Sequence, residues 1–459
     1  MRTAQQSQTA HDSPTASDSP TAPESQPQVP DAGKVRPPML TVIAPADGRV
    51  VDTIVTESPE QVRATVARLR ENATLWHSLG VVGRIHWLTL FRNWLLDNRD
   101  GLVALLGAET GKPESEADAE FGLALDALDH YRAHGAEFLG GRHPQVALRP
   151  GAAMQLAVAH PAGAVVGVIG PWTYPLALAV FDAVPALVAG AAVVVKPSSE
   201  TPLTLRAIAE GWGSIGAPAV FESVSGRDAG PAVLDCVDYV RFTGSVETGK
   251  VVALRAASRL IPCCLDLGGK SAAVVLSDAD LDRAAASIAL GGLANNGQSC
   301  NCIERIYVET AAYDAFLDKL VAEAAAFGPI HGDEIGTGVM TSAAQVELVR
   351  DQVRDALLKG ATLRCGGTGA DHAFEPTVLA DVDPSMAVLT QQTLGPVLPV
   401  VRVADAGEAF DLARRSPAGP CVSVWTTDTV AAARAVGRFA PVPVGVNDIS
   451  VHVARPQPF

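Results

Sequence analysis

The chain has 459 residues, of which 48% are hydrophobic and 19% charged, and its formal net charge at pH 7 is −15. This length predicts two or three domains with sizeable buried cores. The negative charge argues against nucleic acid or an anionic lipid surface as a partner, and polar residues interrupt every apolar run before it reaches membrane-spanning length.

The first segment, residues 1–38, is dominated by Ser, Thr, Pro, Ala, Gln and Asp. Such a composition buries too little apolar surface to offset the entropy of ordering, so we expect a disordered tail. Arg2 is followed by no apolar stretch of the kind that a secretory signal contains. We therefore expect no secretory signal and a cytoplasmic location. The seven scattered cysteines are not a disulfide framework and indicate a reducing compartment.

Residues 39–265 are predicted to form a first domain. From about Glu60, apolar residues recur at steps of three and four, which indicates a mainly helical beginning. Strands and helices then alternate, which predicts a parallel, doubly wound α/β sheet. The strands are expected in AAMQLAVAHPAGAVVGVIGPW, AAVVVKP and VDYVRFTGS, and the helices in LALAVFDAVPALVAG and LTLRAIAEGWGSIG.

A second α/β alternation follows, and the domain boundary is predicted near residue 265, giving a second domain over residues 266–459. A helix is expected in AAYDAFLDKLVAEAAAF, and strands are expected in CIERIYVE, GPVLPVVRV and CVSVWTT. No segment repeats with a period of 20 to 50 residues, which excludes solenoids and propellers.

Cys300 stands out because it lies in the polar, glycine-containing segment NNGQSCNC after a helical stretch. Structural cysteines usually lie in apolar sequence, as Cys263 and Cys264 do, whereas a nucleophilic thiol needs access and hydrogen-bond donors. Considered alone, a cysteine such as Cys300 is more often inert than catalytic. The spacing of Cys300 and Cys302 could suggest a metal site, but no second pair at zinc spacing accompanies it.

His130 and His134 are four residues apart and therefore share one face of a predicted helix. Two histidines without further ligands do not make a metal site, and Asp129 and Arg132 beside them indicate a solvated helix face. No metal is predicted.

Six motifs occur in order along the chain: GPWTYP at 170–175, VVVKPSSETP at 193–202, FTGSVETG at 242–249, LDLGGKS at 265–271, NNGQSC at 295–300 and LGPVLP at 394–399. Together they resemble the aldehyde dehydrogenase superfamily from about residue 40 to the last residue. The resemblance implies an α/β fold with two doubly wound domains, one for the cofactor and one for catalysis, and a bridging hairpin near 146–160.

The resemblance also implies a mechanism in which Cys300 attacks an aldehyde carbonyl. Thr173 and the backbone N–H of Cys300 would hold the oxyanion, hydride would pass to a nicotinamide, and Asp266 would activate the water that hydrolyses the thioester. Each assignment has a structural alternative. Thr173 could cap a helix that starts at Pro175, and Asp266 could be a loop carboxylate paired with Lys270.

The cofactor expected from the resemblance is NAD or NADP. Lys196 follows a strand and can reach ribose hydroxyls or a 2′-phosphate, while glycines permit a close approach of the backbone. Many relatives that prefer NAD carry Glu where this chain has Ser199, which would not repel a 2′-phosphate. The cofactor-binding residues implied are Trp172, Lys196, Ser199, Gly226, Gly230, Gly244, Ser245, Leu267, Gln392 and Leu394.

The departures from the family pattern lie around the expected chemistry. Thr173 replaces Asn, and losing an oxyanion donor costs roughly a hundred- to thousandfold in rate. Asp266 replaces Glu and is one methylene shorter, so slower deacylation is expected. Gln392 and Leu394 replace a ribose-binding Glu and a Phe, which predicts a looser grip on the cofactor.

The sequence ends at Phe459, where relatives continue with a last strand that pairs across subunits, so a homo-oligomer is in doubt. The leading functional hypothesis is an NAD(P)-dependent dehydrogenase that oxidises a small-molecule aldehyde to its acid. A first alternative is a CoA-acylating dehydrogenase, in which a thiol resolves the thioester. A second is a catalytically silent relative with a binding role.

Overall fold

The computed structural model of the chain describes residues 38–139, 145–149, 152–155, 162–327, 338–415 and 419–449. Residues from Pro38 onward form one compact unit. Except for residue 38, the tail predicted over residues 1–38 lies outside the described residues, as do residues 450–459. None of the described helices combines the length and the apolar character needed to cross a bilayer.

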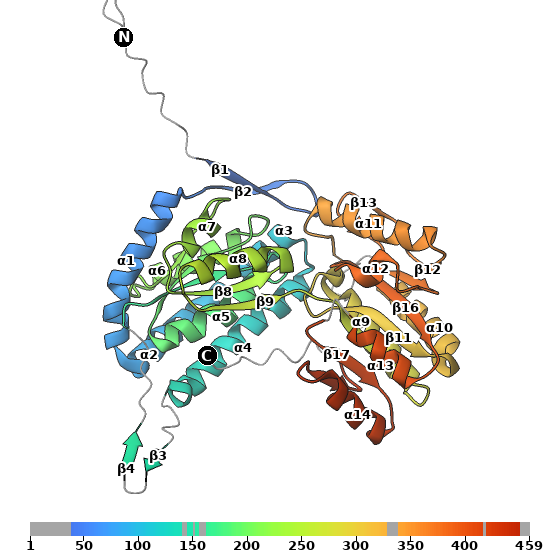
Figure 1. Cartoon of the computed structure of the whole chain (residues 1–459). Coiled ribbons are helices and arrows are strands. Elements are labelled where there is room, and N and C mark those ends of the chain that lie inside the picture. Colours follow the sequence, from blue (N-terminus) through green and yellow to red (C-terminus); the bar gives the residue numbers. More distant parts are fainter. Residues whose placement is uncertain are drawn as a thin grey trace, which may run out of the picture. The chain divides into compact units, whose positions relative to one another are not determined.

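The described part of the chain begins with an antiparallel hairpin, β1 (Met39–Ile43) and β2 (Val50–Val55), which the sequence pattern did not predict. Four helices follow, as expected (Figure 1): α1 (Pro59–Ser78), α2 (Gly80–Asp97), α3 (Arg99–Thr110) and α4 (Glu114–Leu139). The first begins at Ser58, which forms a reciprocal capping box with Gln61. The third ends at Gly111, whose φ of 82° suits glycine.

A five-stranded sheet, parallel throughout, forms the first α/β layer, with the strand order β7-β6-β5-β8-β9. The chain order reverses between β5 and β8, and ligands bind at such a switch point beyond the carboxyl ends of the strands. The predicted doubly wound sheet is confirmed. Its strands are β5 (Val165–Ile169), β6 (Ala192–Lys196), β7 (Phe221–Ser223), β8 (Tyr239–Gly244) and β9 (Cys263–Leu267). Its helices are α5 (Pro175–Ala189), α6 (Leu203–Ser214), α7 (Ala229–Leu234) and α8 (Val246–Ser258).

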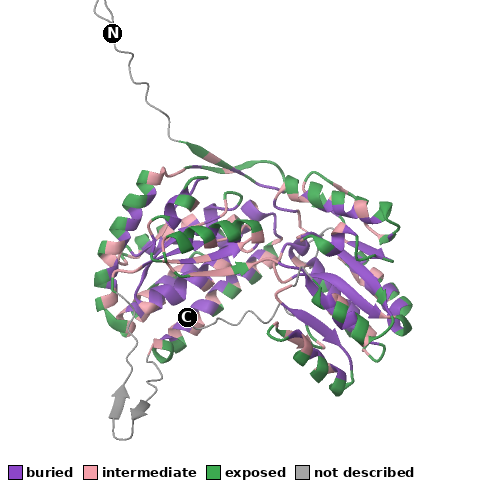
Figure 2. Ribbon diagram, viewed as in Figure 1, coloured by how far each residue is buried: buried purple, intermediate pink, exposed green. Residues whose placement is uncertain are grey.

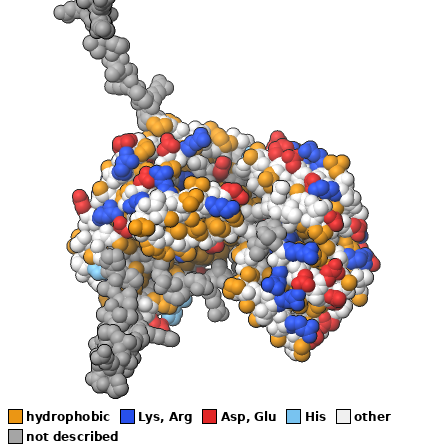
Figure 3. Space-filling model, viewed as in Figure 1, with side chains coloured by type: hydrophobic (Ala, Val, Ile, Leu, Met, Phe, Trp, Pro, Cys, Tyr) orange, Lys and Arg blue, Asp and Glu red, His pale blue; other side chains and the backbone are white. Residues whose placement is uncertain are grey.

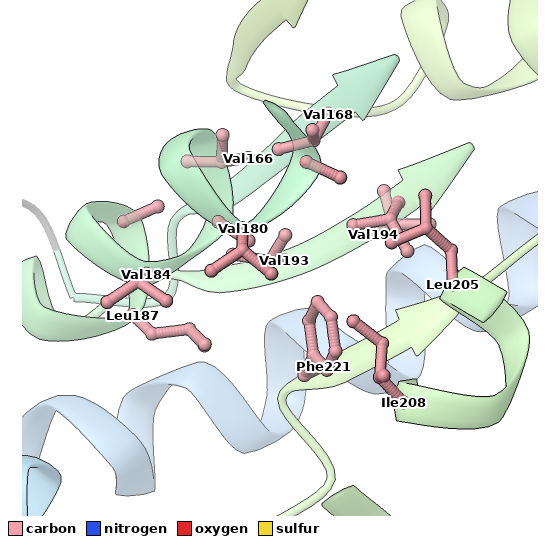
Figure 4. Packing of buried hydrophobic residues seen from close by; sticks show 14 of the residues in the cluster. Val166, Val168, Val180, Val184, Leu187, Val193, Val194, Leu205, Ile208 and Phe221 are labelled. Atoms are coloured by element: carbon pink, nitrogen blue, oxygen red, sulfur yellow. The ribbon is translucent and has the colours of Figure 1, made fainter. Parts of the chain in front are cut away.

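All residues of β5 and all but the last residue of β6 are buried, and Figure 2 shows buried residues concentrated inside the structure. In Figure 4, Val180 and Val184 of α5 lie against the valines of these strands. Leu205 and Ile208 of α6 lie beside Phe221 of β7. Near-continuous runs of Val and Ala are what a parallel strand buried on both sides requires.

The second sheet has seven strands in the order β12-β15-β16-β11-β10-β17-β18, and only the edge strand β12 is antiparallel to its neighbour. Side chains of β10 alternate between two cores, with Ala272 and Val274 in one and Ala273 and Val275 in the other. The strands are β10 (Ser271–Val275), β11 (Ile303–Glu309), β12 (Thr362–Cys365), β15 (Thr377–Ala380), β16 (Val397–Val403), β17 (Val422–Trp425) and β18 (Val444–Val446).

Helices cover this sheet too: α9 (Leu281–Leu293), α10 (Thr310–Ala326), α11 (Ala343–Leu358), α12 (Ala387–Thr390), α13 (Ala406–Arg414) and α14 (Thr429–Phe439). An antiparallel pair, β3 (Gln145–Arg149) and β4 (Ala152–Gln155), falls in the region of the predicted bridging hairpin, whose residues 156–160 lie outside the described residues; the bridging role stays a prediction. A second short antiparallel pair consists of β13 (Gly369–Ala370) and β14 (Ala373–Phe374). The last strand of the first sheet ends at Leu267 and the second sheet begins at Ser271. The domain boundary near residue 265 stays a prediction.

On the face of the molecule in Figure 3, Lys and Arg side chains are interspersed with Asp and Glu. Apolar side chains gather where α8 lies, and that helix leaves Val251 and Leu254 largely exposed.

Candidate active site

The loop that carries Cys300 is shaped by a tight turn after α9. The turn, η1 (Ala294–Gly297), contains Asn295 and Asn296 with φ of 52° and 54°, a conformation that Asn tolerates better than most residues. The side chains of Asn295 and Gln298 fasten the turn, because Asn295 Nδ2 donates to Gln298 O at 2.9 Å and Gln298 Nε2 donates to Asn295 O at 3.0 Å. The backbone that leads to Cys300 is therefore held in one conformation.

The Cys300 thiol is only partly accessible. Burial raises its pKa to about 12, and the negative charge of Asp266 acts in the same direction, while the backbone N–H groups of Cys300 and Asn301 lower it. Cys302 is fully buried, and burial raises its pKa even further. Of these two thiols, only Cys300 is accessible to a ligand.

Thr173 lies directly before α5 and is brought to the cysteine loop by a hydrogen bond in which Asn295 Nδ2 donates to Thr173 O at 3.2 Å. The alternative of a helix cap at Thr173 is wrong, because the N-cap residue of α5 is Tyr174. The first N–H groups of α5 instead donate to the buried carboxylate of Glu120. The Thr173 hydroxyl therefore does not cap α5, and its role as an oxyanion donor remains a prediction.

Asp266 lies on β9 rather than in a loop, one residue before the strand ends at Leu267. Water reaches its side chain, yet the surrounding protein is dense enough that burial raises its pKa, and the positive charge of Arg241 opposes this rise. The predicted alternative of a pair with Lys270 is wrong. Lys270 is fully buried and ion-paired with Glu304 instead. Asp266 is thus a water-accessible carboxylate whose charge acts on Cys300.

The cofactor side of the site lies where the five-stranded sheet changes direction. Lys196 ends β6, and burial lowers the pKa of its ammonium, with no carboxylate contributing to the shift. Gly244 ends β8, and Ser245 caps α8 by accepting from Thr248 N. A Cβ on Gly244 would lie 2.6 Å from the Phe242 ring, so only glycine fits here. Lys196 and Gly244 both lie at the carboxyl ends of parallel strands, where such sheets bind dinucleotides.

Two glycines expected in the cofactor site have different surroundings. Gly226 has a φ of 120°, and a Cβ there would lie 2.8 Å from Thr56 Cβ, so this glycine makes room for the segment after β2. Gly230 lies in the first turn of α7, with open space where a side chain would be. Ser199 is exposed, and Trp172 is half-buried between β5 and α5. The cofactor roles of these four residues remain predictions.

Gln392 and Leu394 lie in the segment that precedes β16. The Gln392 amide packs against Gly268, because a Cβ added to Gly268 would clash with Gln392 Nε2. Leu394 has a φ of 45°. The structure therefore brings the Gln392 segment to the LDLGG segment, and the cofactor roles of Gln392, Leu394 and Leu267 remain predictions. Leu267 points away from this contact and packs against Gly249 of α8.

The sequence reasoning missed the residues that hold this segment. Glu304 of β11 accepts from Thr393 N at 2.8 Å and from Leu394 N at 3.0 Å, and its carboxylate also binds the ammonium of Lys270. Gln352 Nε2 donates to Gln392 O at 3.1 Å. The only available signal was two opposite charges, Lys270 and Glu304, inside strongly apolar surroundings.

No group of three or more His, Cys, Asp and Glu side chains within the described ranges could hold a metal ion. His130 and His134 do share a helix face, with ring centroids 4.9 Å apart.

A family model described as the aldehyde dehydrogenase family matches residues 34–459. The chain is 33% identical over 420 residues to the 4,4'-diapolycopene aldehyde oxidase of Methylomonas sp, covering 91% of this chain and 79% of that protein. The structure is similar to an NADP-dependent glyceraldehyde-3-phosphate dehydrogenase of Bacillus halodurans in complex with NADP, with a TM-score of 0.84, 28% identity and coverage of 90% and 88% of the two chains. It is also similar to an NAD-dependent benzaldehyde dehydrogenase of Corynebacterium glutamicum, with a TM-score of 0.83, 29% identity and coverage of 90% and 91%.

Proposed function

The chain belongs to the aldehyde dehydrogenase family, and from this premise we propose that it oxidises an aldehyde to the carboxylic acid with Cys300 as nucleophile and NAD or NADP as oxidant. The observation that supports this most strongly is electrostatic. The carboxylate of Asp266, near the end of β9, acts on the Cys300 thiol, which lies in the turn before β11. A nucleophile, a nearby base and oxyanion donors are the groups that such a reaction needs.

Cys300 begins as a protonated thiol, because burial raises its pKa to about 12. The thiol proton passes to solvent water, which reaches this partly accessible side chain, and the resulting thiolate forms a bond to the carbonyl carbon while the carbonyl π electrons move to oxygen. The resulting oxyanion receives hydrogen bonds from the Cys300 N–H and the Thr173 hydroxyl. The bound cofactor supplies the acceptor for the hydride that leaves the former carbonyl carbon.

Deacylation then requires water at the thioester. The water oxygen bonds to the thioester carbon while Asp266 accepts a proton from that water, the C–S bond breaks, and the Cys300 sulfur leaves as thiolate; Asp266 then releases its proton to solvent. The exposure of the Asp266 side chain supports this role, since hydrolysis needs a path for water to the base.

The cofactor would be held by Lys196, Gly244 and Ser245 at the switch point and by Gln392 on the opposite side. The NADP-bound and NAD-dependent relatives support either cofactor. Ser199 adds no negative charge to repel a 2′-phosphate, so we propose that NADP is accepted as well as NAD.

The test measures NADH or NADPH formation with aromatic, phosphorylated, polyene and short aliphatic aldehydes, with and without coenzyme A. Cys300→Ala should abolish formation of reduced cofactor, whereas the matched control Cys302→Ala, which removes a buried thiol two residues away, should retain turnover. Acyl-CoA as the product would favour a CoA-acylating enzyme. Equal activity of Cys300→Ala and wild type would refute the nucleophile.

A further inference from the structure

One face of the β8–β9 pair carries a row of polar side chains. The two strands are parallel, with Arg241 opposite Cys264 and Thr243 opposite Asp266. Side chains of a strand alternate between faces, so Arg241 and Thr243 share the face that carries Asp266. Arg241 is therefore the diagonal neighbour of Asp266 across the strand pair.

The guanidinium of Arg241 is anchored from above this face by α5. Its Nε donates to Asp182 Oδ1 at 2.7 Å, and Asp182 is 5% exposed. Burial raises the pKa of Asp182, Arg241 lowers it, and the negative charge of Asp266 raises it again. One cation thus serves two carboxylates. It binds Asp182 directly and acts on Asp266 through its charge.

We propose that Arg241 is a positioning residue for Asp266: its cation keeps the Asp266 carboxylate ionised and ready to accept a proton from water, and Asp182, which binds the guanidinium, limits how strongly that charge acts on Asp266. This inference rests on the proposed function, in which Asp266 is the base. Asp182 belongs to the same helix whose first turn follows Thr173, so α5 connects the oxyanion donor to the electrostatics of the base.

Other titratable groups lie close to Asp182, Arg241 and Asp266, and their charges also act on these three residues. They are Tyr239 of β8, Tyr131 of α4, Cys264 of β9 and the Cys300 thiol. The charged residues of α8 are on the other side, because α8 packs through Gly249 on Leu267, whose side chain points away from the Asp266 face. Among the groups that act on Asp266, Arg241 supplies the positive charge.

The experiment measures the acid limb of the pH profile for thioester hydrolysis in the full chain, after single-turnover acylation. Arg241→Gln removes the cation, so the limb should move to higher pH by about half a unit to one unit. Asp182→Asn removes a competing anion and frees Arg241 for Asp266, so the limb should move to lower pH. Opposite shifts distinguish an electrostatic role from structural damage, which would lower the rate without moving the limb.

Two control variants complete the design. Arg241→Lys retains the charge and should keep the acid limb near its original position. If Arg241→Gln misfolds, the comparison of Arg241→Lys and Asp182→Asn with wild type still tests the inference. Arg255→Gln breaks a bidentate pair with Asp235 on the α8 side of the sheet and should leave the limb unchanged. Shifts in the same direction in Arg241→Gln and Asp182→Asn, or no shift in either, would overturn the inference.

Asp266→Asn distinguishes a failure of the proposed base from a failure of the positioning role of Arg241. If Asp266→Asn hydrolyses the thioester as fast as wild type, Asp266 is not the base and the proposed function fails at that step. If Asp266→Asn hydrolyses the thioester slowly but the acid limb does not move in the Arg241 and Asp182 variants, the base assignment stands and only the positioning role is lost.

Discussion

Replacing Glu304 by Gln would leave the ammonium of Lys270 buried without its counter-charge. The side chains of Lys270 and Glu304 are 0% and 3% exposed, so water cannot compensate. Removing one partner of such a pair costs about 3–5 kcal/mol of the free energy of unfolding. Gln retains one acceptor oxygen, but the second hydrogen bond, to Thr393 N or Leu394 N, would be lost. The segment that carries Gln392 should loosen as a result.

Two readouts test this prediction. Urea unfolding should show a loss of about 3–5 kcal/mol for Glu304→Gln, while the matched control Glu347→Gln, which breaks an exposed pair with Arg350, should change stability by about 1 kcal/mol or less. The KM for the cofactor should rise in Glu304→Gln, because the Gln392 segment loses its anchor, and should be unchanged in the control. A loss no larger than that of Glu347→Gln would refute the reasoning about the buried pair.

The remaining predictions concern single sites. Burial raises the pKa of Glu109 to about 7, so the folded chain binds the Glu109 proton more tightly than the unfolded chain does. The stability that this proton contributes is lost as pH rises from about 4.5 to 7. Glu109→Gln should remove roughly 3 kcal/mol of that pH dependence from the free energy of unfolding measured in urea. Gly244→Val should raise the cofactor KM severalfold in steady-state kinetics, because even a Cβ would lie 2.6 Å from the Phe242 ring. Thr173→Asn should raise the acylation rate about tenfold in a stopped-flow assay, since the longer amide reaches further into the site; an unchanged rate would show that the Thr173 hydroxyl already suffices.

The alternation of strands and helices was predictable because each parallel strand is buried on both faces and reads as a run of Val and Ala, as β6 does. The β1–β2 hairpin was not predictable in the same way. Its strands are short and largely exposed, with burial confined to a few positions such as Val42 and Ile54, so the hydrophobic signal is weak.

In the candidate site, the motif residues were predictable from the sequence and their long-range partners were not. Cys300, Thr173 and Asp266 were assigned by their motifs, and the structure brings Thr173 and Asp266 to the cysteine loop. The partners of these residues were not predictable, because Arg241 and Asp182 are 59 residues apart and meet only when α5 packs on the sheet. Long-range ion pairs carry no local pattern, and the tertiary fold alone decides them.

Trapping the acyl group in Asp266→Asn tests the central claim most directly. This variant, mixed with an aldehyde and NAD or NADP and quenched in acid, should accumulate an acyl thioester that intact-mass spectrometry detects and peptide mapping assigns to Cys300, with no acyl group on Cys302. An acyl group on Cys302, or reduced cofactor formed without any covalent adduct, would contradict the account of Cys300 as the nucleophile.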